Sequence, residues 1–175
     1  MKNKLPPNGE AQEDESSYQS FGQIIKISLI LGIIVVSGFI IFYIVNPDPG
    51  FVGFGILNSE KKAEDYPTNI TVGEDVHFYA YVENHLERPF TFIIKVLKDN
   101  KETELSSNGS KNADLNFTVK KTTLELENDW TSEQLSISYH KNGTNRLLIL
   151  ELWEVTGEET EEFYDIVYLR FNVTA

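Results

Sequence analysis

The sequence predicts an all-β domain, an immunoglobulin-like antiparallel β-sandwich, preceded by a single transmembrane α-helix. Three observations lead to this fold class. One uninterrupted apolar run lies near the N-terminus. Apolar and polar residues alternate through most of the remaining chain, a period that is typical of half-buried strands. Turn sequences separate the alternating runs with no helical periodicity between them, which favours a sandwich.

The composition excludes several classes of site. The 175 residues include 27 Asp and Glu but only 15 Lys and Arg, a net charge of −12. A protein that neutralises nucleic-acid phosphates needs the opposite balance, so we expect no nucleic-acid partner. The chain has no cysteine, which excludes disulfides, thiolate zinc sites and thiol nucleophiles.

Residues 1–23 are expected to form a disordered cytoplasmic tail. Its first twenty residues are rich in Pro, Gly, Ser and Glu and contain few large apolar side chains. Such a segment cannot bury enough apolar surface to offset the entropy cost of folding.

Residues 24–45 are predicted to span the membrane. The run from Ile27 to Val45 has nineteen residues without a charge, of which fifteen are apolar. A helix of this length is about 28 Å long, close to the ~30 Å hydrocarbon core of a bilayer. A cleaved signal peptide is disfavoured, because the leader is long and acidic and the run ends at Asn46-Pro47 rather than at small residues.

The flanking cations predict the orientation of this helix. Lys2, Lys4 and Lys26 precede it, whereas the fifteen residues after Val45 contain no Lys or Arg. The positive-inside rule therefore predicts a cell-membrane protein whose N-terminus is cytoplasmic and whose C-terminal domain is extracytoplasmic.

Ser28 and Gly32 form a small-xxx-small pair within the apolar run. Pairs of this kind let two membrane helices approach closely, but they also arise often by chance. Packing of a partner helix on this face stays an open alternative.

Five Asn-x-Ser/Thr triplets provide an independent indication of topology. Residues 46–175 contain 12 Asn and 19 Ser and Thr, for which chance predicts about two triplets. No triplet precedes the membrane run, so we expect an N-glycosylated extracytoplasmic domain. The candidate acceptors are Asn69, Asn108, Asn116, Asn142 and Asn172.

Residues 46–50 are expected to be a stiff Pro-rich spacer, and residues 51–175 to be the β-sandwich. Asn108-Gly109 and Asn142-Gly143 lie between alternating runs, a strong hairpin signal. Trp130 and Trp153 are expected to lie in the core. The predicted strands are Phe51–Leu57, Asp75–Glu83, Phe90–Leu97, Asp114–Lys120, Thr122–Leu126, Gln134–Tyr139, Arg146–Val155 and Phe163–Val173.

Several stretches of the outer domain resemble a known family. The sequence AEDYPTNITVGE at 63–74 and VENH at 82–85 are similar to the signature of a mainly archaeal membrane-protein family catalogued as a domain of unknown function. The similarity continues in DWTSEQLSISYHKNG at 129–143, RLLILELW at 146–153 and FYDIVYLRFNV at 163–173. The resemblance implies an extracytoplasmic β domain and supplies no catalytic residues. Many members carry several membrane helices, whereas this chain has one.

No motif in the sequence indicates catalysis, a cofactor or a metal. The histidines lack metal-ligand spacing, and there is no Gly-x-Ser-x-Gly elbow. The acidic residues between 158 and 165 contain enough oxygen atoms for Ca²⁺ but lack the Asp-x-Asp spacing of a formed site, so a solvated hairpin tip is favoured. Tyr79 and Tyr81 alternate on one strand face and either pair across the sheet or stack on a ligand.

These observations favour a non-catalytic interaction module at the cell envelope. We expect its helix to contact the lipid bilayer and its partner to be a protein or a glycan. An accessory subunit of a larger membrane complex is the alternative. An envelope hydrolase or transferase is less favoured, because it requires acid and base groups clustered in a cleft.

Overall fold

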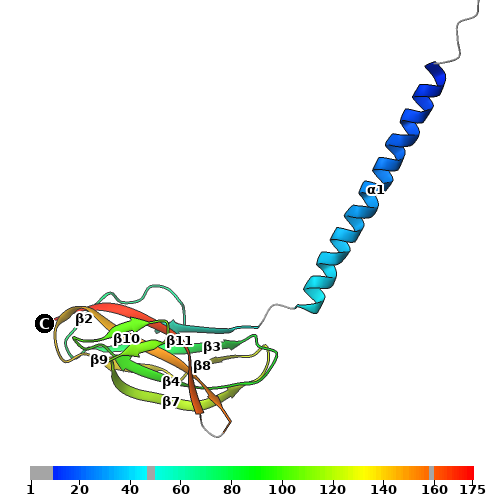
Figure 1. The fold of residues 1–175 in the computed structure, drawn as a ribbon. Helices are drawn as coiled ribbons and strands as arrows, with labels where there is room; N and C mark the ends of the chain where they lie inside the picture. Colours follow the sequence, from blue (N-terminus) through cyan, green and yellow to red (C-terminus); the bar gives the residue numbers. More distant parts are fainter. Residues whose placement is uncertain (1–9, 47–49, 158–159) are drawn as a thin grey trace, which may run out of the picture. The chain divides into compact units, whose positions relative to one another are not determined.

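A computed structural model describes residues 10–46, 50–157 and 160–175, with side chains described from residue 21 onward. The chain divides into two compact units, Met1–Asp48 and Pro49–Ala175. The first contains the helix and the second contains the β domain (Figure 1).

The first unit is one α-helix, α1, Glu10–Val45. Its segment Phe21–Val45 is long and apolar enough to cross a membrane. Every large apolar side chain from Phe21 to Val45 is at least 50% exposed. Because nothing in the described part of the chain covers this surface, the segment has the character of an anchor or a signal sequence rather than of a core helix.

The helix begins earlier than the sequence analysis predicts. Residues 10–23 are helical in the structure, whereas the sequence analysis assigns them to a disordered tail. Glu, Gln and Ala are good helix formers, and extending an existing helix avoids the cost of a new nucleus. Residues 1–9 lie outside the described residues, as do residues 47–49 of the predicted spacer.

The second unit contains the strands of the described chain, which are more numerous and in part shorter than expected. The strands are β1 Val52–Leu57, β2 Asn69–Thr71, β3 Asp75–Asn84, β4 Phe90–Lys98, β5 Glu104–Ser106, β6 Gly109–Lys111, β7 Asp114–Leu124, β8 Asp129–Thr131, β9 Leu135–Ser138, β10 Gly143–Thr156 and β11 Thr160–Thr174. The two strands predicted between residues 114 and 126 are one strand, β7, whose pairing with β4 shifts register near its middle.

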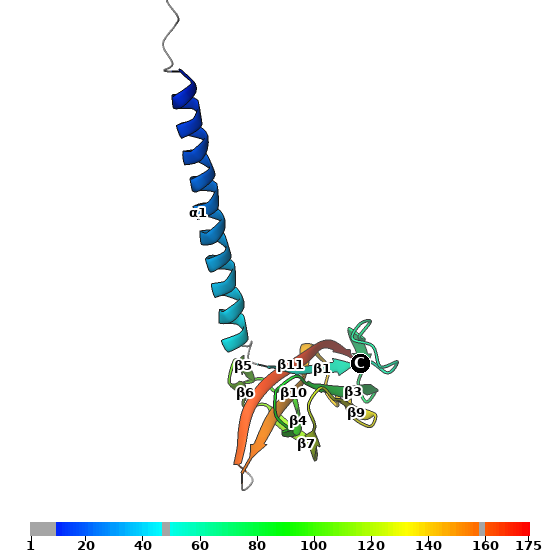
Figure 2. The same cartoon turned by 90° about the vertical axis from the view of Figure 1, so that its right-hand side faces the viewer.

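These strands form two main layers and one small hairpin. One sheet has the order β1-β3-β8, with β9 also paired to β3, and the other has the order β2-β11-β10-β4-β7. All pairings are antiparallel except the one between β2 and β11. β10 and β11 form the long bent hairpin of the second sheet (Figure 2). The predicted immunoglobulin-like β-sandwich is confirmed.

The core fills the space between the two sheets. Alternate residues of β4 and β10 point inward, and Phe92, Ile94 and Leu150 are 0% exposed. The facing sheet contributes Phe78 and Val82. The predicted alternation of β3 is confirmed, because its even-numbered residues are buried and its odd-numbered ones are not.

The two tryptophans differ in position. Trp130 packs against the core, with its ring centroid 5.4 Å from that of Phe92. The prediction that Trp153 lies in the core is wrong. Its neighbour Leu152 points inward, so strand alternation places Trp153 on the outer face. There its ring packs on Phe163, and the ring centroid lies 3.9 Å from Lys95 Nζ.

Candidate functional site

An open groove of about 910 Å³ lies at one end of the sandwich. Its walls come from the end of β4 and the connection that follows, residues 98–102, and from the start of β7, residues 114–116. The segment from the end of β9 to the start of β10, residues 138–144, and Arg146 complete it. Antiparallel pairing brings these distant segments to the same end of the fold.

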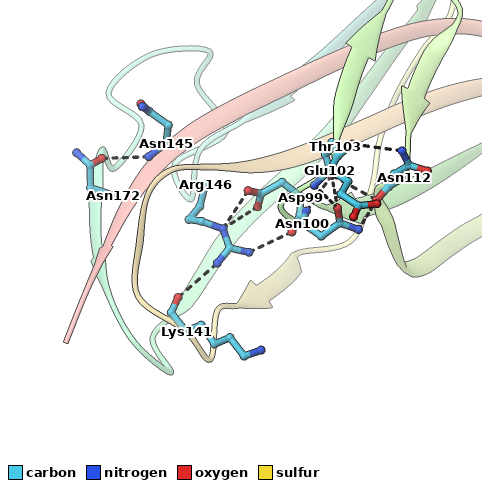
Figure 3. A network of polar contacts seen from close by, with 9 residues as sticks. All are labelled: Asp99, Asn100, Glu102, Thr103, Asn112, Lys141, Asn145, Arg146 and Asn172. Atoms are coloured by element: carbon cyan, nitrogen blue, oxygen red, sulfur yellow. Dashed lines mark hydrogen bonds and ion pairs between the residues drawn. The ribbon is translucent and has the colours of Figure 1, made fainter.

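Arg146 fixes two walls of the groove to each other (Figure 3). Its Nε lies 3.0 Å from both carboxylate oxygens of Asp99, and its Nη2 donates to the Asp99 carbonyl at 3.1 Å. Its Nη1 donates to the carbonyl of Lys141 at 3.4 Å. Charge-assisted bonds of this kind are stronger and more directional than neutral ones, so Arg146 acts as a brace between these two walls.

Asn100 organises the second wall (Figure 3). Its backbone N–H donates to Thr103 Oγ1 at 2.8 Å, and its side-chain oxygen accepts from the N–H of Glu102 at 2.9 Å. Its amide nitrogen donates to the carbonyl of Asn112 and to Asp114 Oδ1. An Asn side chain that binds the backbone two residues ahead is typical of a fixed turn, so this wall is preorganised.

Lys98 and Tyr139 lie at the base of the groove. Lys98 Nζ donates to the Ser138 carbonyl at 2.9 Å. Burial and the nearby Arg146 guanidinium lower the pKa of Lys98. Tyr139 is 2% exposed, its burial raises the pKa of its hydroxyl, and that hydroxyl has no hydrogen-bond partner in the described part of the chain.

The structure places the five candidate glycosylation residues in three regions. Asn116 and Asn142 are exposed at the groove, and Asn108 is exposed in the turn between β5 and β6. Asn69 and Asn172 lie side by side on the parallel pair β2–β11, where Asn172 Nδ2 donates to Asn69 Oδ1 at 3.2 Å.

The signature at residues 63–74 has a structural role in the fold. Tyr66 donates its hydroxyl hydrogen to the Ile56 carbonyl at 2.6 Å, which ties the segment to β1. Gly73 has φ +84°, the left-handed conformation that a tight turn requires and that favours glycine. The carboxylate of Glu74 accepts from the backbone and hydroxyl of Thr71, both at 2.8 Å, and these bonds lower its pKa.

The acidic residues near the β10–β11 turn do not form a metal site in the described chain. No group of three His, Cys, Asp or Glu side chains is arranged to hold a metal ion in the residues that the structure describes. Glu161 pairs with Lys95 at 2.7 Å. Glu158 and Glu159 lie outside the described residues.

His85 is the histidine with the most defined surroundings. Its Nε2 lies 2.8 Å from Glu83 and its Nδ1 lies 3.1 Å from Glu127. Its ring packs on Phe51, with the centroids 4.7 Å apart. Because ionised carboxylates only accept hydrogen bonds, both contacts are hydrogen bonds when both ring nitrogens are protonated, and this geometry favours the imidazolium form. The hydrogen bonds to Glu127 and Glu83 accordingly raise the pKa of His85.

We expect the contribution of His85 to stability to depend on pH. Because its folded-state pKa is raised, the stabilisation is complete below the unfolded-state value of about 6.5 and is lost as pH rises through the higher folded-state value. NMR titration of the imidazole should give a pKa above 6.5, and Glu127→Gln should lower it. A pKa for His85 that is unchanged by Glu127→Gln would contradict this interpretation.

The candidate helix-packing pair is exposed. Ser28 and Gly32 lie one turn apart on α1 and are both exposed. A Cβ atom added at Gly32 would meet nothing within 4 Å. Nothing in the described part of the chain occupies this face, so any packing there needs another helix.

Comparison with known families and structures gives one family match. A family model described as "Domain of unknown function (DUF1616)" matches residues 46–167. Comparison with curated proteins gave no match.

Solved structures with a similar domain come from unrelated contexts. The CARDB domain of the PF1109 protein from Pyrococcus furiosus, in complex with di-metal ions, has 11% identity and a TM-score of 0.45, over 73% of this chain and 90% of that one. A β-glucosidase from Listeria innocua in complex with glucose has 14% identity and a TM-score of 0.42, over 71% and 16%. The alkylpurine DNA glycosylase AlkC from Pseudomonas fluorescens, bound to DNA with an abasic site analogue, has 13% identity and a TM-score of 0.43, over 71% and 30%. Similarities of this size carry no argument about a ligand or an activity of this chain.

Proposed function

The chain belongs to the family described as domain of unknown function DUF1616, and from this premise we propose that it is a single-pass membrane protein whose β-sandwich is a non-catalytic interaction module at the cell envelope. In this proposal α1 is the anchor, the N-terminus is cytoplasmic and the β domain is extracytoplasmic and N-glycosylated. The proposed partner is a protein or glycan of the envelope.

The observation that supports this proposal most directly is the preorganised groove. Arg146 donates to the carboxylate and carbonyl of Asp99, and the Asn100 side chain bonds Asp114 and nearby backbone groups. Side chains whose hydrogen bonds are used in this way fix the shape of a surface, which supports a binding role. A preformed recess with a few fixed polar groups is a common form of a recognition site.

The test compares the capture of a partner by the wild type with its capture by a variant whose groove is blocked. The tagged full chain is purified from native membranes and its partners are identified by mass spectrometry. Leu115→Trp places a large side chain at a groove residue that is 57% exposed, and Leu126→Trp is the matched control outside the groove at 45% exposure. We expect Leu115→Trp alone to lose the partner. Capture that is equal for both variants and the wild type would contradict the assignment of the groove.

The exposure and hydrogen bonds of the acceptor asparagines indicate which of them we expect to be glycosylated. Asn108, Asn116 and Asn142 are exposed and are expected to be modified. Asn172 is half-buried, its amide nitrogen donates to Asn69, and its oxygen accepts from the Asn145 N–H at 3.3 Å. We expect glycopeptide mass spectrometry of the native protein to find Asn172 unmodified. A glycan found on Asn172 would contradict this expectation.

The alternative function, an accessory subunit of a membrane complex, has support from the exposed face at Ser28 and Gly32. It predicts that Gly32→Leu reduces co-purification of a membrane partner, because a large side chain prevents close helix approach. Gly38→Leu is the matched control, since a Cβ there also meets nothing and the residue lies on another face. An equal yield of partner with both variants would remove this alternative.

A further inference from the structure

Lys98 occupies an unusual position for a lysine. It continues the row of inward-pointing residues of β4 that includes Ile94 and Val96, so its side chain lies between the sheets at the open end of the sandwich. It is half-buried, and its described hydrogen bond is to the Ser138 carbonyl at 2.9 Å. A partly buried ammonium group is costly unless an opposite charge compensates it.

No carboxylate within the described residues pairs with Lys98. Asp99, the nearest acidic residue in sequence, is bound by Arg146 through both of its oxygens. Asp114 is the cross-strand neighbour of Lys98 in the β4–β7 register, yet the bond it accepts comes from Asn100. The acid next to Lys98 in sequence and the acid across from it on β7 are thus engaged elsewhere, and no carboxylate of the described residues forms an ion pair with Lys98.

The groove also differs in charge from the rest of the domain. Its lining includes four cations, Lys98, Lys101, Lys141 and Arg146, and three carboxylates. Residues 46–175 as a whole contain 12 cations and 23 carboxylates, which leaves eight and twenty outside the groove. A slightly cationic groove on a strongly acidic domain favours an anionic group at that place.

The other residues that line the groove limit which class of anion can bind there. Glu102 and His140 are exposed groove residues whose side chains form no hydrogen bond within the described part of the chain. Carboxylates accept hydrogen bonds from hydroxyl groups but repel a second anionic charge. A ligand with one carboxylate and several hydroxyls fits this lining, whereas an acidic peptide with several carboxylates does not.

We propose that the groove binds an acidic sugar, with Lys98 as the partner of the sugar carboxylate and Glu102 and His140 as hydrogen-bond partners of its hydroxyl groups. The inference rests on the proposed function, because it names the ligand class of the same interaction site. The ring of Tyr139 lies beneath Lys98 and Arg146 at the base of the groove, and its buried hydroxyl has no hydrogen-bond partner among the described residues.

The test measures binding of small probes to the full chain in detergent micelles by saturation-transfer NMR. Glucuronate is the probe, glucose is its neutral counterpart, and N-acetylglycine carries a carboxylate without hydroxyls. We expect the Kd for glucuronate to be at least about tenfold lower than for either of the other two, since charge-assisted hydrogen bonds are the strong ones.

Variants of Lys98 assign the effect to this residue. Lys98→Met keeps the apolar stem and removes the charge, and it should raise the Kd for glucuronate by about tenfold. Lys98→Arg keeps the charge and should stay within a few-fold of the wild type. Lys120→Met, on an exposed residue of β7 outside the groove, is the control and should have no effect. Thermal unfolding of each variant separates loss of binding from loss of fold.

Three results would overturn the proposal. The first is an equal Kd for glucose and glucuronate, and the second is a Kd for glucuronate that Lys98→Met leaves unchanged. The third is a Kd for N-acetylglycine as low as that for glucuronate, which would indicate a peptide carboxylate as the ligand instead. Partner capture distinguishes these failures from failure of the proposed function. A partner that is still lost with Leu115→Trp would keep the interaction module and reject only the acidic sugar.

Discussion

Replacing Asn84 by alanine is expected to destabilise the β domain by about 3–5 kcal/mol, because several buried polar groups lose their partners together. Asn84 is 0% exposed. Its amide nitrogen donates to the carbonyls of Arg88 and Leu124, both at 3.0 Å, and its side-chain oxygen accepts from the Leu86 N–H at 2.9 Å. This one side chain therefore joins the β3–β4 connection to the end of β7.

Equilibrium unfolding in denaturant measures this effect. Asn128→Ala is the matched control, because the Asn128 side chain is exposed and only its backbone is bonded to Asn84. We expect the control to change the free energy of unfolding by no more than about 0.5 kcal/mol. Equal stability of the two variants would contradict the role assigned to Asn84.

Placing two lysines in the middle of α1, as Ile33→Lys with Val36→Lys, is expected to release the protein from the membrane. Each lysine costs roughly 2.5–3.5 kcal/mol at the centre of a span, whereas each large apolar residue contributes only about 0.3–0.6 kcal/mol. Two lysines thus offset most of the favourable energy of the fifteen apolar residues between Ile27 and Val45. The chain should then remain in the supernatant after alkaline extraction of membranes.

The control for the span adds the same charge elsewhere. Gln19→Lys with Gln23→Lys introduces two lysines on the N-terminal side of the apolar run and leaves that run intact. This variant should sediment with the membranes as the wild type does. If the Ile33→Lys, Val36→Lys chain stays in the membranes after alkaline extraction, the conclusion that the apolar run anchors the protein is wrong.

Local patterns predicted the elements that depend on neighbouring residues. The alternation of β3 and the turns at Gly73 and Asn108-Gly109 depend on residues close in sequence, and the structure contains them. β7 was divided in two because Lys120 and Lys121 interrupt the alternation. In the structure a shift of register against β4 accommodates this interruption without ending the strand.

The groove could not be predicted, because its residues come together only through long-range pairing. Lys98, Asp114 and Ser138 are far apart in sequence and meet where β4 ends, β7 begins and β9 ends. The turn signal at Asn142-Gly143 lies in one wall of the groove but does not indicate which segment that wall faces. The buried hydrogen bonds of Asn84 could likewise not be predicted from the VENH stretch at 82–85, because one of its partners, Leu124, lies forty residues away.

Trp153 shows the limit of hydrophobicity as a guide to the core. The run from Arg146 to Trp153 is apolar on both faces of β10. The β5–β6 hairpin supplies Leu105 to a second apolar cluster with Leu97, Leu147 and Ile149. A sheet covered on both sides makes outer residues as apolar as inner ones, so the sequence could not assign Trp153 to a face.

Labelling of single-cysteine variants in intact cells tests the central claim, a membrane anchor with an extracytoplasmic β domain, most directly. The chain has no cysteine, so Lys121→Cys on β7 and Lys4→Cys near the N-terminus each introduce one thiol. A membrane-impermeant maleimide should label Lys121→Cys in intact cells and Lys4→Cys only after the cells are opened. Labelling of Lys4→Cys alone in intact cells would reverse the topology and contradict the account.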